Sequence, residues 1–149
     1  MREEELRRYF MGEASVSQLA KDISGSVIKV DAVQSEIRIA DMQGSFSVQR
    51  DHLIRLCEAF LDRELTPEAL NTIGFALQAS DAFEWEDEVI SEVLSDWSAP
   101  EVNFELNAET LNMHRDLLLS YGEPPVRKPI DPHHRINARL ISLRTKTTY

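Results

Sequence analysis

The apolar positions along the chain repeat with two different spacings. Before residue 25 and after residue 50 the spacing is helical; in LIRLCEAFL (53–61), apolar residues at i, i+1, i+4, i+7 and i+8 form one continuous stripe. Between these regions, SVIKVDAV, SEIRIADM and SFSV alternate apolar with polar residues and are rich in β-branched side chains, as strands are. The pattern therefore predicts an α+β fold that is mainly helical, with about five helices and a small antiparallel β-meander near residues 26–48.

Capping residues indicate where several of the helices begin. Ser15, followed by Gln three residues later, has the pattern of a capping box. Thr66 precedes a proline at the first helical position, and Asn107 precedes the last apolar helical repeat. The helix over 67–79 carries no charge beyond its first turn and has apolar residues on all sides, so we expect it to be buried at the centre of the fold.

The length and the composition indicate one domain with a distinct C-terminal segment. A chain of 149 residues can bury one sizeable core, and we assign residues 1–121 to a single globular domain. Residues 122–149 contain four of the six prolines and form a Pro-rich basic arm, which we expect to be docked. A single cysteine excludes an internal disulfide framework, and no window resembles a signal peptide or a membrane span. We therefore expect a cytoplasmic protein.

Charge is distributed unevenly along the chain. Residues 64–114 contain twelve Asp or Glu and no Lys or Arg, whereas the arm has six cations and two acids. The arm therefore carries +4, and because the whole chain carries −10, residues 1–121 carry −14. Such a charge argues against binding of nucleic acid and permits a basic protein partner. It also predicts that cations of the arm pair with acids of 81–105, within one chain or between the subunits of a homo-oligomer.

The segment SDAFEWEDEVISEVLSDWSAPEVNFE (80–105) holds nine of these acids. It has two interpretations: a solvated helix face, or a surface that binds a cationic partner. Like charges four residues apart on a helix repel, and Glu88, Glu92 and Asp96 form two such pairs. A basic partner would reduce this repulsion. Phe83 and Trp85 would be aromatic anchors at such a surface. The predicted partner-binding residues are Asp81, Phe83, Glu84, Trp85, Glu86, Glu88, Glu92 and Asp96.

The chain shows no motif for catalysis, for a metal or for a cofactor, and we predict none of the three. Cys57 lies on an apolar helix face, which is typical of a buried structural thiol, and His114 has the position of a core histidine. The alternative is a small hydrolase or metal-dependent enzyme that uses carboxylates of 80–105 with His114 as the base. Catalytic carboxylates would converge in a concave pocket, whereas those of a partner surface would spread over a convex face.

Two short motifs carry a resemblance to a known class of protein. DAFEW (81–85) and WSAPEVNFELNAETL (97–111) resemble small acidic bacterial proteins of the immunity type, over about residues 50–121, or a bacterial family of similar build without a known role. In immunity proteins, a helical chain presents acidic and aromatic side chains that block a basic toxin, often a nuclease. The resemblance implies a non-enzymatic protein-binding module with an immunity or antitoxin role. A purely structural homo-oligomer is a third alternative.

Overall fold

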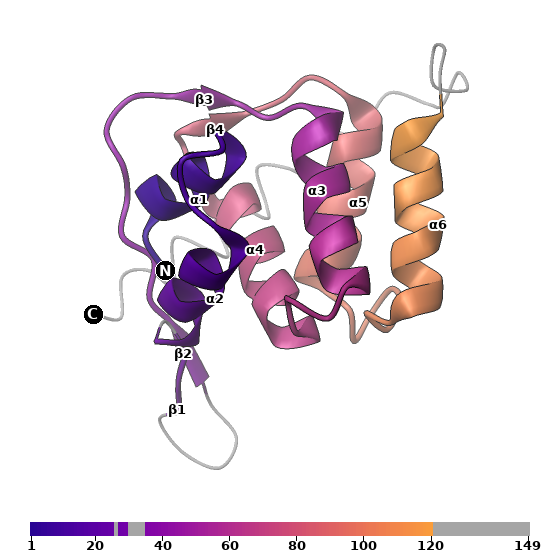
Figure 1. Cartoon of the computed structure of the whole chain (residues 1–149), viewed down its shortest axis with the longest axis horizontal. Helices are drawn as coiled ribbons and strands as arrows, with labels where there is room; N and C mark the ends of the chain where they lie inside the picture. Colours follow the sequence, from indigo (N-terminus) through magenta and orange to yellow (C-terminus); the bar gives the residue numbers. More distant parts are fainter. Residues whose placement is uncertain (26, 30–34, 121–149) are drawn as a thin grey trace.

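The computed structural model describes residues 1–25, 27–29 and 35–120. Within these ranges there are six helices and four very short strands (Figure 1). Along the chain they are α1 (Glu3–Phe10), α2 (Val16–Ser24), β1 (Val27–Lys29), β2 (Ser35–Ile37), β3 (Phe46–Ser47), α3 (Arg50–Leu61), α4 (Pro67–Ala79), β4 (Phe83–Glu84), α5 (Glu88–Ser98) and α6 (Ala108–Leu119). The predicted helical regions and the predicted N-caps Ser15, Thr66 and Asn107 are confirmed, since each of these side chains accepts a hydrogen bond from a backbone N–H of the helix that it begins.

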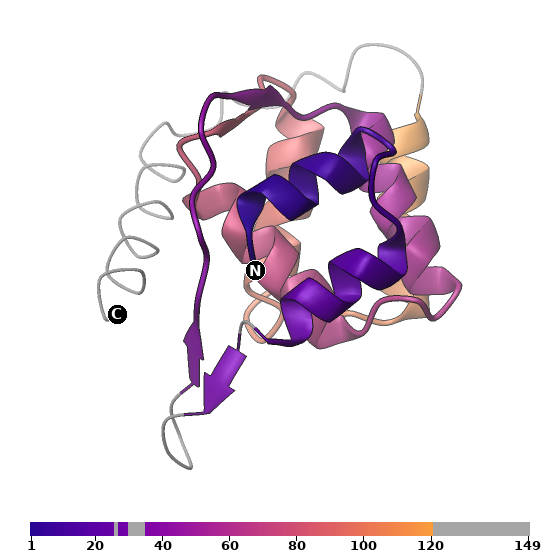
Figure 2. The same cartoon turned by 60° about the vertical axis from the view of Figure 1, so that its left-hand side comes forward.

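The prediction of an α+β fold with an antiparallel meander is wrong, because the strands are only two or three residues long and the third strand has a different partner. β1 and β2 form an antiparallel hairpin, but β3 pairs in parallel with β4, with Phe46 opposite Phe83. The chain leaves the hairpin at Ala40, which forms a parallel bridge with Arg2, and is thereby led away from β1 and β2. Figure 2 shows the hairpin projecting from the helices while β3 lies beside β4 on the body. Alternation identified the strands but holds no information about their partners.

The prediction that the helix over 67–79 is buried is confirmed. α4 packs on α5 and also contacts α2 and α3, and most of its residues are buried. α3 packs on α6, while α1 and α2 lie on the side of the molecule away from α6 (Figures 1 and 2). Arg55 joins α3 to α1, because its guanidinium donates to the carbonyls of Tyr9 and Phe10 at the C-terminal end of α1, each at 2.9 Å. One hydrophobic core runs through the described residues.

α4 and α5 approach each other closely where Gly74 meets Trp97. A β-carbon placed on Gly74 would lie 2.7 Å from Cβ of Trp97 and 3.1 Å from the backbone N of Ser98, closer than real side chains pack. The amide of Asn71 donates to the Trp97 carbonyl at 2.9 Å, and Gln78 exchanges hydrogen bonds with Ser95 and Ser98. The helix crossing is therefore fixed by backbone contact and by polar side chains on both sides of it.

No helix within the described ranges has the combination of length and hydrophobicity that crossing a lipid bilayer requires.

The crossing yields a stability prediction. Gly74→Ala adds a methyl group where Trp97 and the α5 backbone leave no space, so the substitution should lower the free energy of unfolding by about 1–3 kcal/mol despite the better helix propensity of Ala. Gly25→Ala is the matched control, because Gly25 has a φ of −86° and no atom lies within 4 Å of the added carbon. Urea titration measures both; equal stability of the two variants would contradict the close approach.

Candidate functional site

The two predicted aromatic anchors belong to the core. Phe83 is fully buried and packs edge-on against Phe10 and Phe46, with ring centroids 6.2 and 6.0 Å away. Trp85 is also buried, and its indole N–H donates to the hydroxyl of Ser91 at 2.7 Å. This corrects the expectation that Phe83 and Trp85 present their side chains to a partner. Their flanking acids point outward because side chains alternate along the extended segment that contains β4.

Asp87 stabilises the start of α5. Its carboxylate accepts from the Val89 N–H at 2.9 Å, as an N-cap does, and forms a two-bond ion pair with Arg50. Partial burial alone would raise the pKa of Asp87, but the hydrogen bonds from Arg50 and Val89 and the charge of Arg50 outweigh it, so the pKa lies below its usual range. Arg50 also donates to the Ser120 carbonyl at 3.0 Å. This ion pair therefore joins the ends of three helices.

Asp96 is part of a buried polar chain that joins α5 to α6. The indole N–H of Trp97 donates to Nδ1 of His114 at 3.1 Å, and Nε2 of His114 lies 3.0 Å from Oδ2 of Asp96. Because an indole N–H can only donate, Nδ1 accepts, and the ring proton is on Nε2, where it is donated to Asp96. The His114 side chain is 2% exposed and that of Asp96 16%. Asp96, predicted as a surface residue, thus satisfies a buried histidine.

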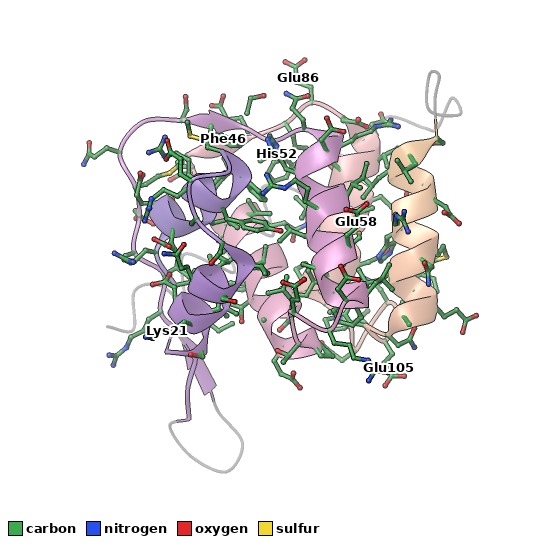
Figure 3. The ribbon with its side chains drawn as sticks, in the orientation of Figure 1. Lys21, Phe46, His52, Glu58, Glu86 and Glu105 are labelled. Atoms are coloured by element: carbon green, nitrogen blue, oxygen red, sulfur yellow. The ribbon has the colours of Figure 1, made fainter. Side chains whose placement is uncertain are left out.

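The other predicted acids differ in their exposure. Asp81, Glu84 and Glu86 are exposed, and Glu88 and Glu92 are half-buried on α5. Figure 3 shows Glu86 at one end of the molecule and Glu105, also from the acidic segment, at the other. Groups of three or more His, Cys, Asp or Glu side chains that could hold a metal ion do not occur among the described residues.

His114, the base of the enzyme alternative, already has hydrogen-bond partners inside the fold. Both ring nitrogens of His114 are engaged, so neither is free to accept a proton from a substrate. A shallow pocket of about 280 Å³ lies between the α1–α2 junction and α3, where Tyr9, Arg55 and Glu58 line it. No acid of 81–105 lines that pocket. Cys57 is fully buried, which confirms the prediction of a buried thiol, and burial raises the pKa of that thiol to about 12.

A surface segment that the prediction missed follows α5. All five residues from Glu101 to Glu105 are exposed, and they include two large apolar side chains, Val102 and Phe104. Helical and strand periodicity carry no information about residues in a connection, so this segment was not among the predicted aromatic anchors. Pro100, which ends the helical pattern, was the signal that the aromatic after it lies in a loop.

Comparison of the chain with protein-family models, with curated proteins and with solved structures gave no match.

The buried polar chain yields the first prediction for this site. Asp96→Ala leaves the Nε2–H of His114 without an acceptor, so it should lower the free energy of unfolding by about 1–3 kcal/mol. Asp96→Asn should cost less, because an amide oxygen can still accept. Glu101→Ala is the control, since Glu101 is exposed and forms no ion pair among the described residues. If urea titration finds Asp96→Ala as stable as Glu101→Ala, the proposed role of Asp96 is wrong.

The Arg50–Asp87 pair yields a prediction about pH. Because the pKa of Asp87 is lower in the folded chain than in the unfolded chain, the unfolded chain binds the proton first as pH falls. The stabilisation is fully present above about pH 5 and is lost progressively below about pH 4. The difference in unfolding free energy between the wild type and Asp87→Asn should therefore shrink as the pH falls below about 4. In an Arg50→Met background it should be small throughout; a wild-type difference independent of pH would contradict the pairing.

Proposed function

We propose that the chain is a non-enzymatic, acidic protein-binding module whose partner is a basic protein. The observation that carries this proposal is a set of exposed acids that form no ion pair with any described residue. In the described part of the chain, no ion pair is formed by Glu84, Glu86, Glu101, Glu105 or Glu109. These residues are all exposed. Ordinary surface helices and loops mix charges of both signs, because unrelieved like charges repel.

The sign and the distribution of charge favour a protein partner with many Lys or Arg. Residues 1–121 carry −14, and an acidic surface of this strength raises the rate at which a basic protein associates. Glu86 and Glu105 lie at opposite ends of the molecule, and the pocket between the α1–α2 junction and α3 is lined by no acid of 81–105, which fits recognition of another macromolecule better than recognition of a small substrate. The resemblance of residues 81–85 and 97–111 to immunity-type proteins supports the same class of partner, with an immunity or antitoxin role in the cytoplasm.

The proposal is tested by capture followed by measurement on purified partners. The tagged full-length chain is incubated with lysate of its native cells, captured proteins are identified, and each is purified for calorimetry at about 50 and about 300 mM NaCl. We expect a partner with a large positive net charge whose affinity falls at the higher salt concentration, because exposed charges are screened. An immunity role also predicts that co-expression of this chain relieves toxicity of that partner.

The control is the full chain with Glu84, Glu86, Glu101, Glu105 and Glu109 replaced by Gln, which keeps shape and removes charge. It should bind the same partner more weakly and with less dependence on salt. A partner of negative net charge, or an affinity that neither salt nor these substitutions change, would overturn the proposal.

A further inference from the structure

The connection between α5 and α6 holds apolar side chains in solvent. Five consecutive exposed residues, Glu101–Glu105, lie between Trp97, which is fully buried, and Leu106, which is 4% exposed. Val102 is 77% exposed and Phe104 51%. Leu106, two residues after Phe104, is a core residue, whereas Phe104 lies outside the core. We call Glu101–Glu105 the apical loop.

The apical loop is fixed at both ends. The backbone N–H groups of Val102 and Asn103 donate to the Ala99 carbonyl, each at 3.1 Å, and the Asn103 amide donates to the Ser95 carbonyl at 3.3 Å. After the loop, the side chain of Asn107 accepts from the Thr110 N–H at 2.9 Å and begins α6. A loop held in this way presents its apolar side chains with little further loss of conformational entropy on binding.

The end of the molecule that carries the apical loop is strongly acidic. Figures 1 and 2 place the α3–α4 connection and the α5–α6 connection at this same end, and Figure 3 shows Glu105 there. Exposed acids of the two connections and of the helix starts that follow them are Asp62, Glu64, Glu68, Glu101, Glu105 and Glu109. Arg63 is the one exposed cation of these same segments.

Local helix stabilisation accounts for only part of this charge. Glu68 and Glu109 lie in the first turns of α4 and α6, where acids interact favourably with the helix dipole. Asp62 is at the C-terminal end of α3, where the dipole disfavours an acid, and Glu101 and Glu105 lie outside any helix. These acids and the exposed Phe104 therefore require another explanation.

We propose that the apical loop is the contact surface for the basic partner, with Phe104 and Val102 inserting into an apolar patch of that protein and the surrounding acids pairing with Lys or Arg at its rim. This inference rests on the proposed function and adds the location and the chemistry of the contact. A central apolar anchor surrounded by charged residues is the usual arrangement of a protein interface. The occupant is a basic protein because the rim carries six acids and a single cation.

Two synthetic peptides test the contact on the full-length chain. One is an amphipathic helical peptide of Lys and Leu, and the other replaces every Leu by Gln, so the two have equal charge. We expect the Lys/Leu peptide to bind more tightly than the Lys/Gln peptide. Phe104→Ser should lower the ratio of the two affinities by about fivefold or more. Val102→Ser, at a more exposed position, should act in the same direction without a change in thermal midpoint.

A charge-matched pair of variants tests the location. Glu101→Gln with Glu105→Gln should weaken binding of both peptides, whereas Glu84→Gln with Glu86→Gln, at the other end of the molecule, should weaken it much less. If the two double variants weaken binding equally, or if Phe104→Ser and Val102→Ser leave the preference for Lys/Leu intact, this inference is overturned while the proposed function stands. If the wild type binds neither peptide, both are overturned.

A third variant tests whether the chain covers its own loop. In it, the six cations of 122–149 are replaced by Gln in the full-length chain. If this variant binds the Lys/Leu peptide more tightly than the wild type, and the gain disappears with Phe104→Ser, the apical loop belongs to the chain's own C-terminal segment. That result would overturn the proposal of a separate partner.

Discussion

The backbone contact between α4 and α5 at Gly74 is the constraint on which the rest of the structure depends. It places Trp97 against the buried helix, and the indole of Trp97 then reaches His114 on α6. His114 is in turn satisfied by Asp96, the neighbour of Trp97 in sequence, so a single turn of α5 positions both α4 and α6. The apical loop begins at Glu101, four residues after Trp97, so its position is set by this turn.

Acids in the same segment have different roles, and the structure separates them. Asp87 and Asp96 are used inside the fold, one as a helix cap paired with Arg50 and the other as the acceptor for a buried histidine. Removal of either carboxylate should lower the free energy of unfolding. The side chains of Glu84, Glu86, Glu101 and Glu105 are exposed and form no ion pair among the described residues, so they are available to a partner. The functional hypothesis therefore rests on the exposed subset of the segment.

Features that depend on sequence neighbours could be predicted, and features that depend on distant partners could not. The helix starts at Ser15, Thr66 and Asn107 follow from residues within one turn, and the buried α4 follows from its own apolar pattern. β3 pairs with β4, which lies some forty residues further along the chain, and this pairing places Phe83 beside Phe46. Asp96 and His114 are likewise joined only by the fold. The predicted docking of residues 122–149 lies outside the described residues.

The central claim is that the aromatic residues of DAFEW are core and that the apical loop is the contact surface. Nuclear magnetic resonance of the isotope-labelled full-length chain, titrated with the Lys/Leu peptide, tests it residue by residue. The account predicts that backbone signals of Glu101–Glu105 shift while the indole N–H signals of Trp85 and Trp97 stay in place, since both are hydrogen-bonded inside the protein. A shift of the Trp85 indole signal with unchanged signals from the apical loop would contradict it.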